Sequence, residues 1–99
     1  MEEQIQATLS STDEERLVQM CKALGNEKRM QIVRFLRQHP ACITNDIVAH
    51  TPLAQATISQ HLKVLREAGI ISGTIQGPAM CYCINEEAID WLKQQIERL

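Results

Sequence analysis

Two cysteines near the end of the chain have a spacing that could bind a soft metal ion or carry out redox chemistry. Cys81 and Cys83 lie one residue apart in the run Met80 to Ile84, which is typical of a β-strand. Alternate residues of a strand point to one face, so both thiols share a face and Tyr82 turns toward the core. Thiolates bind trivalent arsenic, antimony and other soft metals, and exposed thiols also react with oxidants and sulfur species. Alternatively, these cysteines only fill the surface of a sheet.

A second group of polar side chains follows one face of a predicted helix in the stretch LAQATISQHLKVLREAGII, from Leu53 to Ile71. The apolar residues of this stretch recur at helical spacing, and Gly69 marks its end. Amide and hydroxyl groups suit base edges in the DNA major groove, and lysine suits phosphates. The same face could also be the solvent side of an ordinary amphipathic helix. It consists of Gln55, Thr57, Ser59, Gln60, His61 and Lys63.

The elements around this helix predict how it is held. Thr51-Pro52 breaks the chain before it, and a hairpin follows it, with Gln76-Gly77-Pro78 between two strand-like runs. The expected order α-α-β-α-α-β-β-α is a mainly α fold with a small β-wing, a winged helix-turn-helix. We expect helices over 11–24, 26–39, 44–50, 53–68 and 86–99, and strands over 41–43, 70–75 and 80–84.

Length and composition indicate one small domain. The chain has 99 residues, of which 44% are hydrophobic and 3% aromatic, so the core is expected to be aliphatic. We expect an acidic polar tail over 1–10 and a single domain over 11–99, with the helix-turn-helix over about 44–68 and the wing over about 70–84. The first residues show no signal peptide, and no apolar run could span a membrane, so a cytoplasmic protein with reduced thiols is expected.

Charge is unevenly distributed along the chain. The formal net charge is −2, but residues 16–82 hold eight basic and three acidic side chains. A basic middle between acidic ends suits a face that binds a polyanion, although charges scattered over a solvated surface would give the same count. Glycine-rich phosphate loops and paired nucleophiles and bases are missing from the sequence, so an enzyme is not expected.

The segments ALGNEKRMQIVRFL and LAQATISQHLKVLREAGII, with a wing ending in CYCIN, resemble the ArsR/SmtB family of winged-helix repressors. The resemblance covers roughly Leu17 to Ile84. It implies a homodimer in the bacterial cytoplasm, which binds a near-palindromic DNA site and leaves it when an inducer binds. It also implies that the terminal helices form the dimer interface, including the helix over about 86–99. Apolar stripes suited to that interface are Leu17, Met20 and Leu24 in the first helix, and Leu92, Ile96 and Leu99 in the last.

The sequence departs from the family pattern in its DNA-facing part. Ala54 stands where members often have serine, and the wing stretch Thr74-Ile75-Gln76-Gly77 lacks the usual basic residue. Weak wing contacts are therefore expected, with Gln76 as a candidate. Binding would rely on Lys28, Arg29 and the polar helix face.

The usual metal ligands of the family are also missing. Ile43-Thr44-Asn45-Asp46-Ile47 replaces a C-x-C-D-L motif, and no histidine follows His61, so zinc sensing through those sites is not expected. Family members pair the short strand before the third helix with the last strand, which would bring Cys42 beside Cys81 and Cys83. These three thiols are the candidate site for As(III), Sb(III), another soft metal or a redox signal. Cys21, on an apolar stripe, is expected in the core.

These observations predict a dimeric, sequence-specific DNA-binding regulator, a repressor released by a thiol-reactive inducer. The alternative is a winged-helix protein-interaction module that does not read DNA, which the negative net charge and the uncharged wing favour. No cofactor is certain, and no membrane partner is expected.

Overall fold

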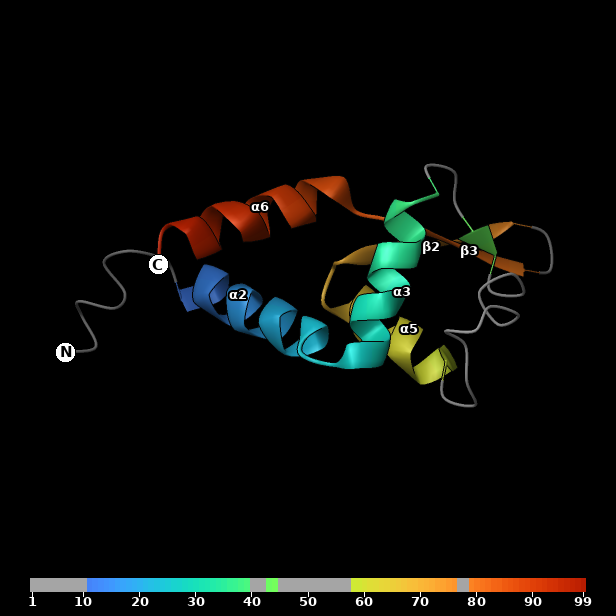
Figure 1. The fold of residues 1–99 in the computed structure, drawn as a ribbon, viewed down its shortest axis with the longest axis horizontal. Coiled ribbons are helices and arrows are strands. Elements are labelled where there is room, and N and C mark those ends of the chain that lie inside the picture. The colour runs from blue at the N-terminus through green and yellow to red at the C-terminus, as the bar shows by residue number, and fades with distance from the viewer. Residues whose placement is uncertain (1–10, 40–42, 45–57, 77–78) are drawn as a thin grey trace.

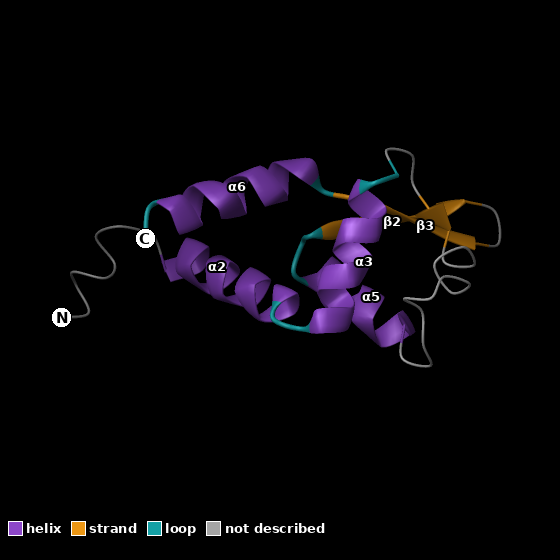
Figure 2. Cartoon of the chain, viewed as in Figure 1, coloured by secondary structure: helices purple, strands orange, loops and turns teal. Residues whose placement is uncertain are grey.

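A computed structural model describes residues 11–39, 43–44, 58–76 and 79–99. Helices α2 and α6 lie side by side at one end, the strands lie at the other, and α3 and α5 lie between them (Figures 1 and 2). None of the helices in these ranges has the length and apolar run needed to cross a bilayer. The elements are α2 (Ser11–Leu24), α3 (Glu27–Arg37), β1 (Ile43–Thr44), α5 (Ile58–Glu67), β2 (Ile71–Gln76), β3 (Ala79–Ile84) and α6 (Glu86–Glu97).

Two asparagines, Asn26 and Asn85, cap the N-terminal ends of helices, as their positions in the sequence predict. The Asn26 side chain accepts a hydrogen bond from the backbone N–H of Arg29 at 3.1 Å, at the start of α3. The Asn85 side chain accepts one from the backbone N–H of Ala88 at 3.2 Å, at the start of α6. Each cap satisfies an amide that has no partner within its helix.

Gly69 ends α5 in a backbone conformation that other residues rarely adopt. Its φ is +80°, in the left-handed region. The N–H of Gly69 donates to the carbonyl of Arg66 at 3.0 Å, and that of Ile70 donates to the carbonyl of Leu65 at 3.0 Å. This pair of bonds is the Schellman motif, which closes the helix and directs the chain into β2. Ile70 therefore belongs to the helix end, and the strand starts at Ile71 rather than at the predicted residue 70.

The three strands form an antiparallel sheet in the order β1-β3-β2. Strand β1 pairs with β3, so that Ile43 lies opposite Tyr82 and Thr44 lies opposite Cys81. The sequence pattern predicts Thr44 as the cap of a short helix, and the structure places Thr44 at the end of β1, in the extended backbone that a cap residue also has. The rest of that predicted helix and residues 41–42 lie outside the described residues.

The core is aliphatic, as the composition predicts. The side chains of Met20, Ile32, Leu65 and Ile70 are fully buried, and they come from α2, α3, α5 and the start of the wing. Cys21 is exposed, so its predicted place in the core is wrong. The buried side of α2 runs through Met20 and Ala23, and residue 21 lies about 100° around the helix from Met20.

Candidate nucleic-acid interface

Helix α5 presents polar side chains on one side and buries apolar ones on the other. Leu62 and Leu65 are 3% and 0% exposed, and Ile58 packs against the same core. Ser59, Gln60 and Lys63 are exposed, whereas His61 is half-buried. The structure thus places four of the six predicted polar residues on α5, and three of them are exposed. Gln55 and Thr57 lie outside the described residues.

Helix α5 is held against α2 near both of its ends. The side-chain amide of Gln19 donates to the carbonyl of Glu67 at 3.4 Å, at the C-terminal end of α5. Near the N-terminal end, His61 Nδ1 lies 3.4 Å from a terminal nitrogen of Arg29, which itself contacts α2. These contacts connect the two ends of α5 to α2.

The two predicted phosphate contacts of α3 differ sharply in their surroundings. Lys28 is exposed. Arg29 is half-buried, and its Nε donates to the carbonyl of Ala23 at 2.6 Å. Another of its nitrogens donates to the carbonyl of Lys22 at 3.4 Å. All three nitrogens of the guanidinium thus lie near protein atoms, and the DNA contact of Arg29 stays a prediction.

The wing exposes mainly uncharged side chains. Thr74 and Ile75 are exposed, Ile75 to 80%. The side chain of Gln76, the predicted wing contact, lies outside the described residues. Since the sequence has no lysine or arginine between Arg66 and Lys93, the wing strands themselves supply no cation to a phosphate.

The two cysteines of β3, Cys81 and Cys83, differ in their exposure and in their bonding. Tyr82, Met80 and Ile84 belong to the core or pack against it, as strand alternation predicts. Cys81 is a free thiol but is 4% exposed, so its predicted place on an open outer face is wrong. Cys83 is half-buried and takes part in a disulfide, which contradicts the expectation of reduced thiols throughout.

Cys42, the third cysteine of the predicted site, lies outside the described residues. Within the described ranges, no group of three or more His, Cys, Asp or Glu side chains is arranged to hold a metal ion.

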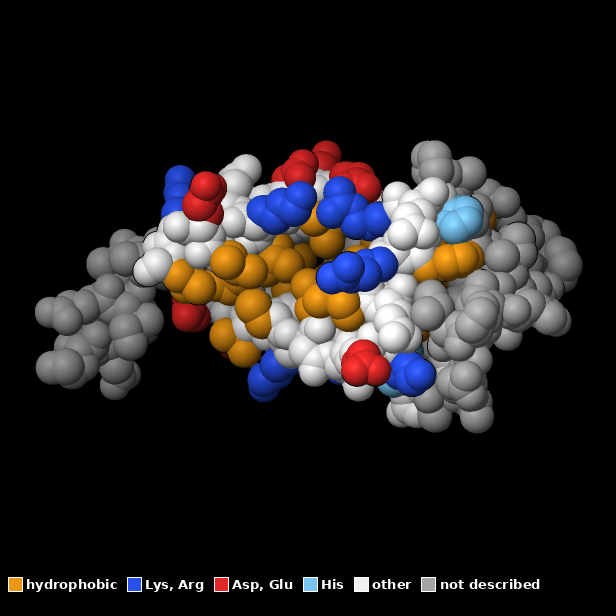
Figure 3. Space-filling view, in the orientation of Figure 1, with side chains coloured by type: hydrophobic (Ala, Val, Ile, Leu, Met, Phe, Trp, Pro, Cys, Tyr) orange, Lys and Arg blue, Asp and Glu red, His pale blue; other side chains and the backbone are white. Residues whose placement is uncertain are grey.

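The terminal helices contact each other and still leave apolar side chains exposed. The Arg16 guanidinium lies 4.1 Å from the centre of the Trp91 ring, a cation–π contact between α2 and α6. Apolar side chains gather where these two helices lie side by side (Figure 3). Ile96 and Leu99 are 47% and 94% exposed, and Val18 is exposed to 44%.

The six residues predicted for the dimer interface divide into three groups. Ile96 and Leu99 are exposed, and Leu17 and Leu24 are half-buried. Met20 and Leu92 are 0% and 5% exposed and belong to the core of the single chain. The prediction is corrected for Met20 and Leu92, because a residue already buried has no surface to offer a second copy. Helical spacing shows which apolar side chains share a stripe, but it does not show which of them the single chain buries and which it leaves exposed.

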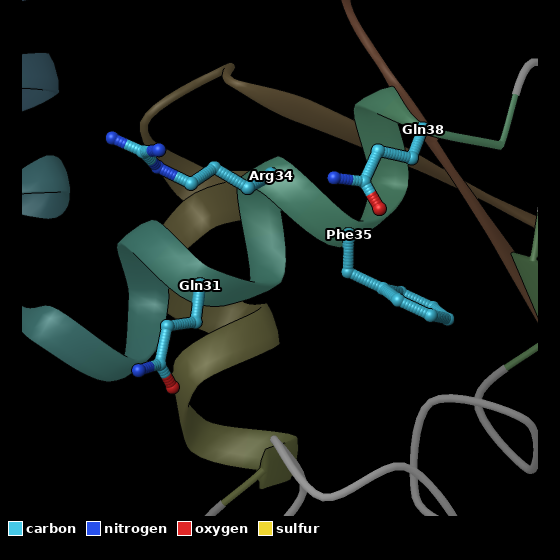
Figure 4. A pocket seen from close by; sticks show the side chains of 4 residues that line it. All are labelled: Gln31, Arg34, Phe35 and Gln38. Carbon is cyan, nitrogen blue, oxygen red and sulfur yellow. The ribbon is translucent and has the colours of Figure 1, made fainter.

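Helix α3 also lines a shallow open hollow of about 270 Å³. Its four lining side chains all come from this helix, and Arg34 and Phe35 point away from each other (Figure 4). Because the polar groups do not converge, the hollow lacks the arrangement of a small-molecule site. The lining residues are Gln31, Arg34, Phe35 and Gln38.

The fold matches solved winged-helix structures. An ArsR-like transcriptional regulator from Rhodococcus sp. RHA1 superposes with a TM-score of 0.74 at 20% identity, over 88% of this chain and 81% of that one. This likeness and the order of the described elements show a winged helix-turn-helix fold.

Sequence relatives narrow this class to a family. The family model described as "Bacterial regulatory protein, arsR family" matches residues 26–72. The arsenical resistance operon repressor of Bacillus subtilis is 31% identical over 74 residues, which are 75% of this chain and 70% of that protein. The uncharacterized HTH-type regulator YbzH of the same organism is 33% identical, over 80% of this chain and 97% of that protein. The chain belongs to the ArsR family and is a transcriptional regulator, not an enzyme.

Sequence reasoning missed the residues that position α5. The sequence patterns do not point to Gln19, and they point to Arg29 only as a DNA contact, not as a residue that links helices. The available signal was local, because Arg29 lies only six residues after Ala23, across the turn at Gly25-Asn26. A long side chain there can reach back to the unpaired carbonyls at the end of the preceding helix.

Proposed function

We propose that this regulator is a homodimeric, sequence-specific DNA-binding repressor of the cytoplasm, which leaves its operator when an inducer reacts with its thiols. The observation that carries the proposal is the exposed row of Ser59, Gln60 and Lys63 on α5, opposite the buried Leu62 and Leu65. Glutamine pairs with two atoms of adenine in the major groove, and serine contacts base edges or phosphates.

Phosphate contacts in this proposal come from lysines rather than from the wing. Lys63 on α5 and Lys28 at the start of α3 are both exposed. Each neutralised phosphate releases counterions, so affinity falls as salt rises. Because the wing strands carry no cation, a shallower salt dependence is expected than for a relative with a basic wing.

Dimerisation would use the exposed apolar side chains of α2 and α6. Ile96, Leu99 and Val18 supply apolar surface in a chain of only 99 residues, which gains stability by covering it. A twofold dimer would set two α5 helices about one DNA turn apart, on a near-palindromic site.

The inducer response is proposed to depend on Cys42 and Cys83. The family resemblance pairs the short strand before the third helix with the last strand, and the described part of that strand does pair Ile43 with Tyr82. The disulfide at Cys83 supports a thiol switch that includes this residue, whereas Cys21 and Cys81 are free thiols.

Closing the bond removes two protons and two electrons from the two thiols, which a disulfide, persulfide or peroxide accepts. Disulfides in cytoplasmic proteins are usually transient and redox-sensing. The same two thiols, reduced, could instead bind As(III), Sb(III) or another soft metal, with the buried Cys81 as third ligand.

The test is fluorescence anisotropy of the reduced protein on labelled DNA from upstream of its own gene. Tight binding that falls steeply with salt is expected, together with release by arsenite or by a persulfide or disulfide oxidant. The variants C42S and C83S should bind DNA and fail to respond, whereas C21S, which removes a free exposed thiol, should respond normally. Normal release of both C42S and C83S would refute the thiol mechanism.

The uncharged wing and the net charge of −2 favour a second candidate, a protein-interaction module that keeps the winged-helix shape. Under that candidate, neither the upstream DNA nor other genomic fragments would bind in a salt-dependent way. Gln60→Ala with Ser59→Ala separates the two further. A repressor should lose far more affinity for the operator than for random DNA.

A further inference from the structure

The side chain of Arg29 joins three elements that are separate in the sequence. It starts from the first turn of α3, bends back over the turn at Gly25-Asn26, and reaches the end of α2. There it donates to the carbonyls of Ala23 and Lys22, at 2.6 and 3.4 Å. The last carbonyls of a helix have no partner within that helix and carry its negative dipole end, so a guanidinium caps them favourably.

The remaining terminal nitrogen of Arg29 faces α5. It lies 3.4 Å from Nδ1 of His61. A guanidinium only donates hydrogen bonds, so a hydrogen bond here requires Nδ1 as the acceptor and the imidazole proton on Nε2. The contact therefore favours one of the two tautomers of His61 and links the ring to the end of α2 through Arg29.

A second contact fixes the other end of α5 to the same helix. Gln19 lies on α2 about one turn before Ala23, and its amide donates to the carbonyl of Glu67. Both ends of α5 are thus linked to α2, one directly and one through Arg29. In the proposed dimer α2 also contributes to the interface, so the spacing of the two α5 helices would depend on this connection.

We propose that Arg29 is a positioning residue for DNA recognition. It ties the C-terminal end of α2 to His61 of α5 and sets the His61 tautomer, and it does not contact phosphate. This inference rests on the proposed function for its DNA-binding readout, but the His61 tautomer can be measured without DNA.

The first experiment is ¹⁵N NMR of the histidine rings of the intact protein at pH 8. Wild type should show His61 protonated on Nε2 only, and R29A should show a mixture of the two tautomers. A wild-type His61 protonated on Nδ1 would overturn the proposal, whatever the variants do. Because this measurement needs no operator, it separates failure of the inference from failure of the DNA-binding proposal.

The second experiment compares the salt dependence of operator binding for R29A, R29K and K28A. R29A should bind about tenfold more weakly, the loss expected for bonds made by a charged donor, with an unchanged slope of log affinity against log salt. R29K should not restore binding, because a single ammonium nitrogen cannot reach Ala23, Lys22 and His61 at once, as the three nitrogens of the guanidinium do. K28A, the exposed neighbour, is the matched control and should lower the slope by about 0.9. A similar fall in slope for R29A, or rescue by R29K, would identify a phosphate contact and overturn the proposal.

Discussion

Replacing Gly69 with alanine should destabilise the protein through backbone conformation alone. The φ of +80° lies in the left-handed region, which costs an L-residue about 1–2 kcal/mol. A Cβ built at Gly69 meets no atom within 4 Å, so no steric cost is added. Alanine also restricts the unfolded chain, which returns about 0.4–1 kcal/mol. The expected net loss is about 1 kcal/mol in the free energy of unfolding.

Equilibrium urea unfolding measures this loss. For a chain of this size, about 1 kcal/mol lowers the midpoint by roughly 0.5–1 M at an unchanged slope. All variants are compared at one protein concentration, because dimerisation would make the midpoint concentration-dependent.

Gly69→Asn decides between the two possible causes of a loss. Asparagine tolerates the left-handed region better than alanine but is larger. If the backbone causes the loss, Gly69→Asn should be milder than Gly69→Ala. An asparagine variant less stable than the alanine variant would refute the conformational argument and point to packing.

Three further changes have expected outcomes. Gly73→Ala should cost about 1 kcal/mol in unfolding free energy, mainly because its Cβ would come within 3.2 Å of Tyr82 Cε1, whereas Met80 Cε at 2.9 Å is the end of a flexible side chain and can move away. Urea unfolding measures this loss, and a loss above about 3 kcal/mol would mean that neither neighbour can move. Leu65→Ala removes a fully buried side chain of α5 and should cost about 2–5 kcal/mol by the same assay, and a smaller loss would mean that the site collapses around the cavity. Ile96→Glu should weaken dimerisation about 30-fold or more by sedimentation, because each of the two copies loses about 1 kcal/mol of apolar burial from a side chain that is 47% exposed in the single chain. The same charge at the exposed Gln94 is the control, and equal weakening by both would count against an interface centred on Ile96.

The parts of the fold that could be predicted from the sequence are those fixed by neighbouring residues. Asn26, Asn85 and Gly69 each act within a few positions of their own place in the chain, so their spacing was sufficient. The core face of β3 followed from alternation alone, as Tyr82 shows.

The parts that could not be predicted depend on contacts between distant segments. Alternation placed Cys81 opposite the core face but could not show that other parts of the chain bury it. Helical spacing grouped Cys21 with Met20, and only the packing of α2 separates an exposed thiol from a buried side chain. The Arg29–His61 contact joins residues 32 positions apart, and no local pattern encodes it.

The contact between Arg16 and Trp91 has a consequence for folding kinetics. It joins two helices at opposite ends of the chain, so nearly the whole sequence must be closed into a loop before it can form. The entropy cost of closure grows with loop length, whereas the β2–β3 hairpin and the helix caps close short loops. The α2–α6 pair is therefore expected to form after the folding barrier is crossed. Contacts made that late slow unfolding without speeding folding, so this pair would set the lifetime of the folded protomer.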